Sequence, residues 1–372
     1  MDTGDFFGSP GEQDSLKAAF LVQSMDKLGY DVVTLGEREF NYGQDFLLAT
    51  FKKTKIDVVS ANLVYADTKK PFVKPYVIKK MCGARVAFFG LIGTDMKLRT
   101  LLSERALEVK DPVATAKALV PELRKKADIV VLLSHIGLTE GQKLTLEVPG
   151  IDVMAFGHQV GLFREIAKTN GVINTRAGER GQYIPGVHVV IDDGKIASYD
   201  GEVIALDDKV PADEEMNRTV DAFNEEMNRR FANVNSATPP AQPAAVPLAG
   251  DHFLGEKNCR RCHEAEYQMY STQQHARAFA TLTKNQRDSS PDCLPCHVVG
   301  YQQPGGFASK QTTPDLVNVQ CENCHGMGTK HPDKADQNVV VGPDVCLTCH
   351  THEQNPDFDY DEALTHIVHW HQ

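Results

Sequence analysis

The sequence has no apolar run of about 18 residues, so it offers no transmembrane helix. It also lacks an excess of basic residues, because 39 Lys and Arg stand against 50 Asp and Glu and give a formal net charge of −11 at pH 7. Since nucleic acids are bound by basic surfaces, this balance argues against a nucleic-acid partner. The opening residues MDTGDFFGSP have neither a basic start nor a long apolar stretch, and they do not form a recognisable signal peptide.

The composition is that of a globular protein. Of 372 residues, 41% are apolar and 24% are charged, which argues against wholesale disorder. A chain of this length can form two or more domains, each with its own core.

Cysteine is nearly absent from the first part of the chain. Only Cys82 precedes residue 258, and we expect it to be a small buried residue. The other eight of the nine cysteines belong to four copies of one pattern, Cys-x-x-Cys-His. The copies contain Cys259, Cys262 and His263; Cys293, Cys296 and His297; Cys321, Cys324 and His325; and Cys346, Cys349 and His350.

This pattern is the attachment motif of c-type haem. Two thiols at this spacing each form a thioether to one vinyl group of a porphyrin, and the adjacent histidine binds the iron as proximal ligand. Zinc sites and redox motifs also use paired cysteines, but tetrahedral zinc does not require a histidine after every pair. Four copies therefore predict four covalently attached haems.

Helical and strand signals alternate in the first part of the chain. Helical spacing predicts helices at 14–30 and 111–128, and short apolar runs predict strands at 30–36, 56–63, 85–93, 129–135 and 151–158. This alternation predicts a layered α/β domain, which we place at residues 1–205. Strand-like segments beyond residue 170 predict that antiparallel strands complete it.

Residues 206–250 differ in character from the segments on either side. Apolar residues three or four apart predict an amphipathic helix at 212–232, packed on a domain surface. The segment that follows, NSATPPAQPAAVPLAG, is rich in proline and alanine and predicts an extended linker, so we expect the domain boundary near 234–250. From 251 to 372 we expect a mostly helical and irregular domain whose interior is filled by haems.

The last 122 residues contain eleven histidines, of which four directly follow the cysteine pairs. The segments STQQHARAFATL, CLPCHVVGYQQPGG and VQCENCHGMGTKH, in this order, resemble the c-554 type of tetrahaem cytochrome c. The resemblance covers 251–372 and implies three haems with two histidine ligands each. Seven histidines are available as second ligands.

The resemblance also implies which histidine serves which haem. His275 would bind the third haem and His331 the fourth. The first would take His369 from the C-terminal segment THIVH, or His366 in its place. The second haem, attached next to His297, would lack a second histidine and be open to a small ligand.

The N-terminal part resembles the metallophosphoesterases of the 5′-nucleotidase type. The segments MDTGDFFGSP, GEREFNYG, SANL, LLSHIGL and AFGHQV fall in the order seen in that family, over about residues 1–205. The resemblance implies a layered sandwich that holds two divalent metals between loops at strand ends. Such metals activate water and bind phosphoryl oxygens.

Part of this metal site matches the family. Asp5 matches the bridging aspartate, while His135 and His158 match two histidine ligands. Glu37 stands where the family has a metal-binding asparagine, and a carboxylate there can bind a hard metal. For Asp5, His135 and His158 we expect polar residues hydrogen-bonded within an inherited scaffold. The alternatives are a reduced site that binds one divalent metal such as Mn²⁺, with Glu37 as a further ligand, and an adapted binding pocket without metal.

Other positions depart from the family. Arg38 replaces the histidine that would support the leaving group, and Val160 replaces the second histidine of the Gly-His-x-His motif. The family's Asp-x-His motif does not precede Asp5. We therefore expect the hydrolase activity to be impaired. We also expect Met1 to be internal and an upstream segment to carry an export signal.

Together these features predict an exported tetrahaem cytochrome, periplasmic or extracellular, that passes single electrons to redox protein partners. Its first domain would be a scaffold or docking module. One alternative is a bifunctional protein with residual metal-dependent phosphoesterase activity. Another is redox catalysis on a small molecule at the open second haem.

Overall fold

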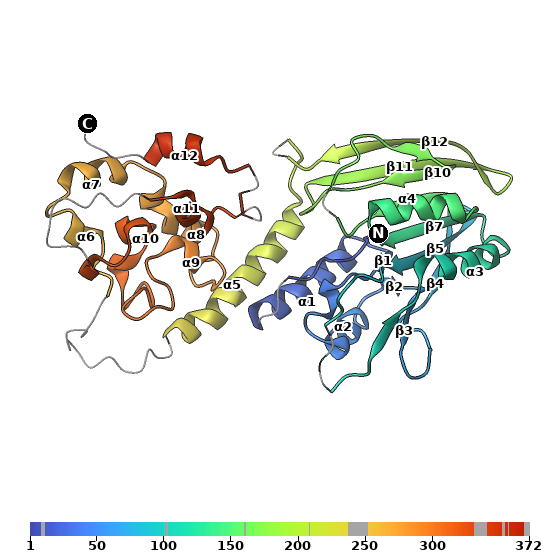
Figure 1. The fold of residues 1–372 in the computed structure, drawn as a ribbon, viewed down its shortest axis with the longest axis horizontal. Coiled ribbons are helices and arrows are strands. Elements are labelled where there is room, and N and C mark those ends of the chain that lie inside the picture. The colour runs from blue at the N-terminus through green and yellow to red at the C-terminus, as the bar shows by residue number, and fades with distance from the viewer. Residues whose placement is uncertain are drawn as a thin grey trace. The chain divides into compact units, whose positions relative to one another are not determined.

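The computed structural model divides the chain into two compact units, Met1–Ala212 and Asp213–Gln372 (Figure 1). The structure describes residues 1–8, 12–99, 101, 103–159, 161–207, 209–236, 252–330, 341–351, 354–355 and 357–367. Within these residues no helix has both the length and the apolar character needed to cross a membrane.

The first unit is built on a six-stranded sheet (Figure 1). Its central strands β5, β7, β8 and β10 are parallel, and β4 and β9 pair antiparallel at its two edges. In order across the sheet the strands are β4 (Tyr76–Met81), β5 (Ala84–Ile92), β7 (Ile129–His135), β8 (Val153–Phe156), β10 (Val172–Thr175) and β9 (Ala167–Thr169). Every residue of β7 and β8 is buried, as expected for strands covered on both faces.

Alternate residues of the central strands serve two different cores. Phe89 and Leu132 pack with helices α3 (Pro112–Arg124) and α4 (Leu138–Glu147). Phe88 and Val131 pack on the other face with the antiparallel hairpin of β11 (Tyr183–Asp192) and β12 (Lys195–Ala205). Successive side chains of a strand point to opposite faces of the sheet, so the sheet is the middle layer, with the helices packed on one face and the hairpin on the other.

Two small sheets and three helices complete the first unit. A third core cluster gathers the large side chains of this part, among them Phe7, Leu35 and Phe40. The elements are α1 (Glu12–Lys27), β1 (Val32–Thr34) parallel to β2 (Asp57–Val59), the 3₁₀ helix η1 (Arg38–Phe40), α2 (Gln44–Phe51), and β3 (Leu63–Tyr65) antiparallel to β6 (Leu107–Val109).

The layered α/β prediction is confirmed, and several elements match closely. The apolar run 129–135 is strand β7. The helix expected at 111–128 spans Pro112–Arg124; the Asp111 side chain caps it by accepting a hydrogen bond from the Ala114 N–H at 2.6 Å. The first unit also ends in an antiparallel pair, β11 and β12.

The second unit is mostly helical and irregular, as predicted. Its small core contains Phe279, Leu294, Val298 and Phe307. The elements are α5 (Glu214–Ser236), α6 (Glu256–Cys259), α7 (Glu264–Ser271), η2 (His275–Arg277), α8 (Ala278–Lys284), α9 (Leu294–His297), η3 (Pro314–Leu316), α10 (Cys321–His325), η4 (Gly328–Lys330), α11 (Pro343–Leu347) and α12 (Tyr360–Ile367).

The structure divides the chain earlier than the proline-rich segment. Helix α5 is grouped with the second unit, so the division falls after Ala212 rather than near 234–250. The Asn228 side chain donates a hydrogen bond to the Gln286 carbonyl, and Gln286 in turn contacts Glu225. Composition predicts where a linker lies but not which unit a surface helix joins.

The expectation for Cys82 is wrong. Cys82 is exposed, because it forms the β4–β5 turn together with Gly83. Both residues have positive φ, 48° and 88°, as the two central residues of a tight hairpin turn require. The adjacent apolar strand suggested burial, but the residue lies at the loop where the hairpin reverses.

Candidate metal centre and haem attachment sites

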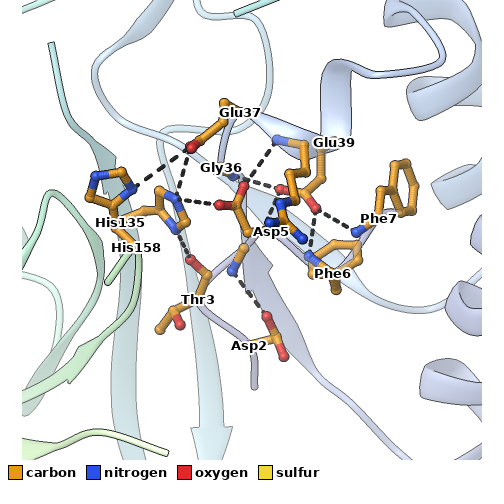
Figure 2. Close-up of polar contacts among 12 residues, drawn as sticks. Asp2, Thr3, Asp5, Phe6, Phe7, Gly36, Glu37, Glu39, His135 and His158 are labelled. Carbon is orange, nitrogen blue, oxygen red and sulfur yellow. Dashed lines mark hydrogen bonds and ion pairs between the residues drawn. The ribbon is translucent and has the colours of Figure 1, made fainter. Parts of the chain in front are cut away.

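Four predicted ligands of the first unit lie together in the structure (Figure 2). His135 ends β7, and His158 follows the neighbouring parallel strand β8. Asp5 and Glu37 come from loops beside β1. One ligand atom from each residue lies within 4.8 Å of the other three, so a single ion could contact all four.

The histidine His135 lies at the centre of this cluster. Its Nδ1 is 2.6 Å from the Thr3 carbonyl oxygen, which can only accept a hydrogen bond, so Nδ1 carries a proton. Its Nε2 faces two carboxylates, at 3.3 Å from Glu37 Oε2 and 3.5 Å from Asp5 Oδ2. In a metal-ligating histidine, one ring N–H usually donates to a backbone carbonyl or carboxylate, and this hydrogen bond points the other ring nitrogen at the metal.

The charges of the cluster favour a cation at its centre. Burial opposes charge on His135, but the Asp5 and Glu37 carboxylates outweigh it and raise the pKa of His135 to about 10. Burial would raise the pKa of Asp5, yet His135 and the Arg38 backbone lower it overall. The hydrogen bond from His135 also lowers the pKa of Glu37. Without a metal the site therefore holds a positive charge between two carboxylates.

The fourth residue, His158, has an unused ring nitrogen. Its Nδ1 is buried, has no hydrogen-bond partner among the described residues, and lies 3.8 Å from Glu37 Oε2. The backbones of His158 and Asp5 adopt left-handed φ values of 71° and 66°. Such strain in non-glycine residues clusters at functional sites, where the surrounding structure enforces it.

The donor set fits a divalent metal. Two imidazole nitrogens and two carboxylate oxygens suit ions such as Mn²⁺, Fe²⁺ or Zn²⁺, and an unpaired buried nitrogen needs a partner. A metal would supply Lewis-acid chemistry and lower the pKa of a bound water. The four predicted residues are thus brought together, and the metal itself stays a prediction.

Arg38 and Val160 are two residues that depart from the family pattern, and the structure describes only the first of them. Arg38 is exposed, and its backbone N–H donates to Asp5 Oδ1 at 2.9 Å, so this position still holds the aspartate. Val160 lies outside the described residues.

The sequence reasoning missed the role of Glu39. Its side chain is fully buried and accepts hydrogen bonds from the N–H groups of Asp5 (2.8 Å), Phe6 (2.9 Å), Phe7 (3.3 Å) and Gly36 (2.6 Å) (Figure 2). Burial raises the pKa of Glu39 to about 7 against the pull of these bonds. The residue fastens the two loops that carry Asp5 and Glu37.

A glycine is required at position 36. A Cβ atom there would lie 2.3 Å from Asp5 Oδ1 and 2.6 Å from the ring of His135. The close approach of backbone to ligands explains why a glycine begins GEREFNYG.

In the second unit the structure pairs the cysteine motifs. The thiols of Cys259 and Cys321, in the first and third motifs, lie close enough for each to shift the pKa of the other. The thiols of Cys296 and Cys349, in the second and fourth motifs, are close in the same way. Motifs that are distant in sequence are therefore adjacent in space.

One motif histidine is oriented as a metal ligand by a hydrogen bond. His297 Nδ1 lies 2.7 Å from the Ala278 carbonyl oxygen, so Nδ1 is the donor and Nε2 has a free lone pair. This is the residue that would bind the iron of the second haem.

The structure places His275 near two motifs: its ring contacts His350 of the fourth, and its carbonyl accepts a hydrogen bond from the Val319 N–H, just before the third. The assignment of His275 to the third haem stays a prediction from the resemblance. The centres of the His275 and His350 rings are 6.2 Å apart. Two metal–nitrogen bonds of about 2 Å, with about 1 Å more from each nitrogen to its ring centre, span about 6 Å. Burial lowers the pKa of both histidines and keeps them neutral, as metal ligation requires.

The other predicted second ligands are not paired by the structure. His331 and His369 lie outside the described residues, and His366 is exposed on α12. Their assignments remain predictions from the resemblance.

Comparisons with known proteins identify both parts of the chain. The family described as "Cytochrome c554 and c-prime" matches residues 258–326. Cytochrome c-554 of Nitrosomonas europaea is 35% identical over 22% of this chain and 41% of its own length. The 2′,3′-cyclic-nucleotide 2′-phosphodiesterase/3′-nucleotidase of Haemophilus influenzae is 34% identical over 40% of this chain and 26% of its own length.

The fold comparison agrees with the sequence comparison for the N-terminal part. The 5′-nucleotidase precursor of Thermus thermophilus has a TM-score of 0.54 and 25% identity, covering 62% of this chain and 50% of that chain. The chain spans well under two thirds of the curated relatives that it matches. It consists of an N-terminal 5′-nucleotidase/metallophosphoesterase-like domain followed by a C-terminal cytochrome c554 domain.

Proposed function

We propose that this protein is an exported electron-transfer cytochrome with four haems, fused to a phosphoesterase-like domain that binds one divalent metal. The observation that carries the electron-transfer part is the proximity of separate motifs, with the thiol of Cys259 near that of Cys321 and the thiol of Cys296 near that of Cys349. Haems attached at adjacent cysteines would lie close to one another. Haem iron supplies a one-electron couple when it is bound.

Residues of the chain would orient the histidines that bind the haem irons. The Ala278 carbonyl fixes the ring of His297, and Phe358 stacks on His350 with ring centres 4.4 Å apart. His275, whose ring centre lies 6.2 Å from that of His350, would complete a two-histidine set at the fourth site. Two histidine ligands on one iron would favour electron transfer over ligand chemistry.

The location proposed is the periplasm or the cell exterior. Covalent haem attachment normally takes place outside the cytoplasm, so a cytochrome c554 domain supports export. The physiological partners would be redox proteins that exchange single electrons with the haems.

For the N-terminal domain we propose metal binding without a hydrolase role. Asp5, Glu37, His135 and His158 would hold the ion, and Arg38 takes the place of the histidine that supports a leaving group in the family. The domain would then act as a scaffold or a docking module.

Residual phosphoesterase activity is the second candidate function. The convergence of four ligands and the strained backbones of Asp5 and His158 favour it, because a scaffold has no need to maintain such strain. The chemistry would be metal-assisted attack of water on a phosphate ester.

Two measurements on the full chain test these proposals. Haem content per chain, from pyridine haemochrome absorbance and intact mass, is expected to be four, and a lower number in fully matured protein contradicts the first. Hydrolysis of 2′,3′-cyclic nucleotides with Mn²⁺ is compared between the parent and Asp5→Ala. Activity lost in the variant supports the second candidate, whereas no activity and no bound metal eliminate it.

The small-molecule alternative depends on the second haem. A high-spin signal in the oxidised protein, changed by an added small ligand, would support an open site next to His297. A purely low-spin spectrum rules it out.

A further inference from the structure

A buried carboxylate lies inside the third haem motif. Glu322 stands between Cys321 and Cys324 and is only 4% exposed. Acidic residues are rarely buried to this degree unless they are bonded to several donors. The residue therefore has a role that the attachment chemistry of the motif does not explain.

The donors that bind Glu322 come from outside its own motif. Its carboxylate accepts hydrogen bonds from the N–H groups of Leu254 (2.9 Å), Gly255 (2.8 Å) and Gly328 (2.6 Å). Leu254 and Gly255 precede helix α6, which ends at Cys259 of the first motif. One carboxylate thus joins the third motif to the segment that leads into the first.

A second side chain strengthens this connection. Gln320 accepts a hydrogen bond from the Glu256 N–H at 2.7 Å and donates to the carbonyls of Asp315 and Val317. Gly255, the N-cap of α6, offers no side chain of its own. The start of the first-motif helix is therefore held by side chains of the third-motif segment, across about 65 residues of sequence.

We propose that Glu322 is a positioning residue shared by the first and third haem sites, and that its buried charge lowers the reduction potentials of both. This rests on the proposed haem attachment at all four motifs. Cys259 Sγ lies 3.9 Å from the Gly255 carbonyl oxygen, and the Gly255 N–H donates to Glu322. Glu322 itself directly follows Cys321, so both porphyrins would attach close to this carboxylate. A buried negative charge stabilises ferric iron relative to ferrous iron, because interactions between charges are strong where water is excluded.

The test is a potentiometric titration of the matured full chain, followed by visible absorption and EPR and resolved into four one-electron steps. In Glu322→Gln two of the four steps are expected to move to more positive potential. A tenfold change in each equilibrium constant corresponds to about 59 mV. The other two steps should stay where they are in the parent.

The matched control is Glu264→Gln. Glu264 directly follows His263 of the first motif, but it is exposed and paired with Arg260 at 2.7 Å. Removing its charge should leave all four steps unchanged, since solvent screens an exposed charge.

Glu322→Asp separates charge from packing. It keeps the charge, so its four potentials should match those of the parent, whereas a purely structural role predicts the same shift as in the Gln variant. The proposal is overturned if no step moves in Glu322→Gln, if all four move together, or if the Asp variant shifts equally. If the Gln variant attaches no haem, two shifted steps in the Asp variant also overturn it, and parent-like potentials support it.

These outcomes are distinct from a failure of the proposed function. A haem content below four would refute the tetrahaem assignment, whatever Glu322 does. If four haems titrate and their potentials are the same in Glu322→Gln as in the parent, only this inference is refuted.

Discussion

Replacing Glu39 by alanine should loosen the metal-binding loops of the N-terminal domain. The carboxylate accepts four backbone N–H groups, from Asp5, Phe6, Phe7 and Gly36. An alanine leaves these donors in a buried space without an acceptor. The two loops then lose the side chain that fastens one to the other.

The size of the effect follows from the count of bonds. A buried donor left without a partner costs about 1–3 kcal/mol. Four such donors give about 4 kcal/mol even at the lower end, before any local rearrangement. A domain with about 5–15 kcal/mol of total stability would lose a large part of it.

Hydrogen exchange read by mass spectrometry is the direct assay, because the amides that bind Glu39 are themselves the probes. Peptides that cover 1–8 and 36–40 should exchange much faster in Glu39→Ala, together with a fall in Mn²⁺ affinity. Glu122→Ala is the matched control, since Glu122 is exposed and pairs with Lys125 at the protein surface. Protection within about 1 kcal/mol of the parent would refute the reasoning.

Three further predictions concern the two sites. His158→Ala removes one of four ligands, so its affinity for Mn²⁺ or Zn²⁺, measured by calorimetry, should fall at least about tenfold. The control, His188→Ala on the exposed face of β11, should bind the metal as tightly as the parent. Equal affinities in the two variants would contradict the metal site. Because the Asp5 and Glu37 carboxylates raise the pKa of His135 from 6.5 to about 10, its ring is charged at pH 7 and loses its proton only as the pH rises through about 10. Metal binding at pH 7 should therefore release about one proton, and the metal affinity should rise with pH up to about 10. A pH-independent affinity would show that the ring is already neutral. His275→Ala should convert one low-spin haem to high spin in the EPR spectrum, because the iron bound by His350 would lose its second histidine ligand. An unchanged spectrum would show that His275 is not a haem ligand.

The sequence predicted those features of the fold that depend on local pattern. Strand β7 was placed at 129–135 because a strand covered on both faces is apolar at every position. The four metal-site residues were found through the family motifs that carry them, which lie at strand ends. Parallel strands bring such ends together, as β7 and β8 do here for His135 and His158.

The features that were missed depend on contacts between distant segments. Glu39 is a single acidic residue in a loop, and no sequence pattern predicts that its side chain accepts hydrogen bonds from four backbone amides on two loops. The contact of His275 with His350 could not be read from motif spacing, because it joins segments that are far apart in the sequence. Cys82 was misjudged because an apolar neighbour does not show where a hairpin turns.

Helix α5 bears on how the cytochrome part could be produced alone. A fragment that begins at residue 251 would remove α5 and would leave the Gln286 carbonyl without the Asn228 amide. A cleavage site introduced after Ala212 follows the natural division of the chain, whereas one in the proline-rich segment cuts inside the second unit.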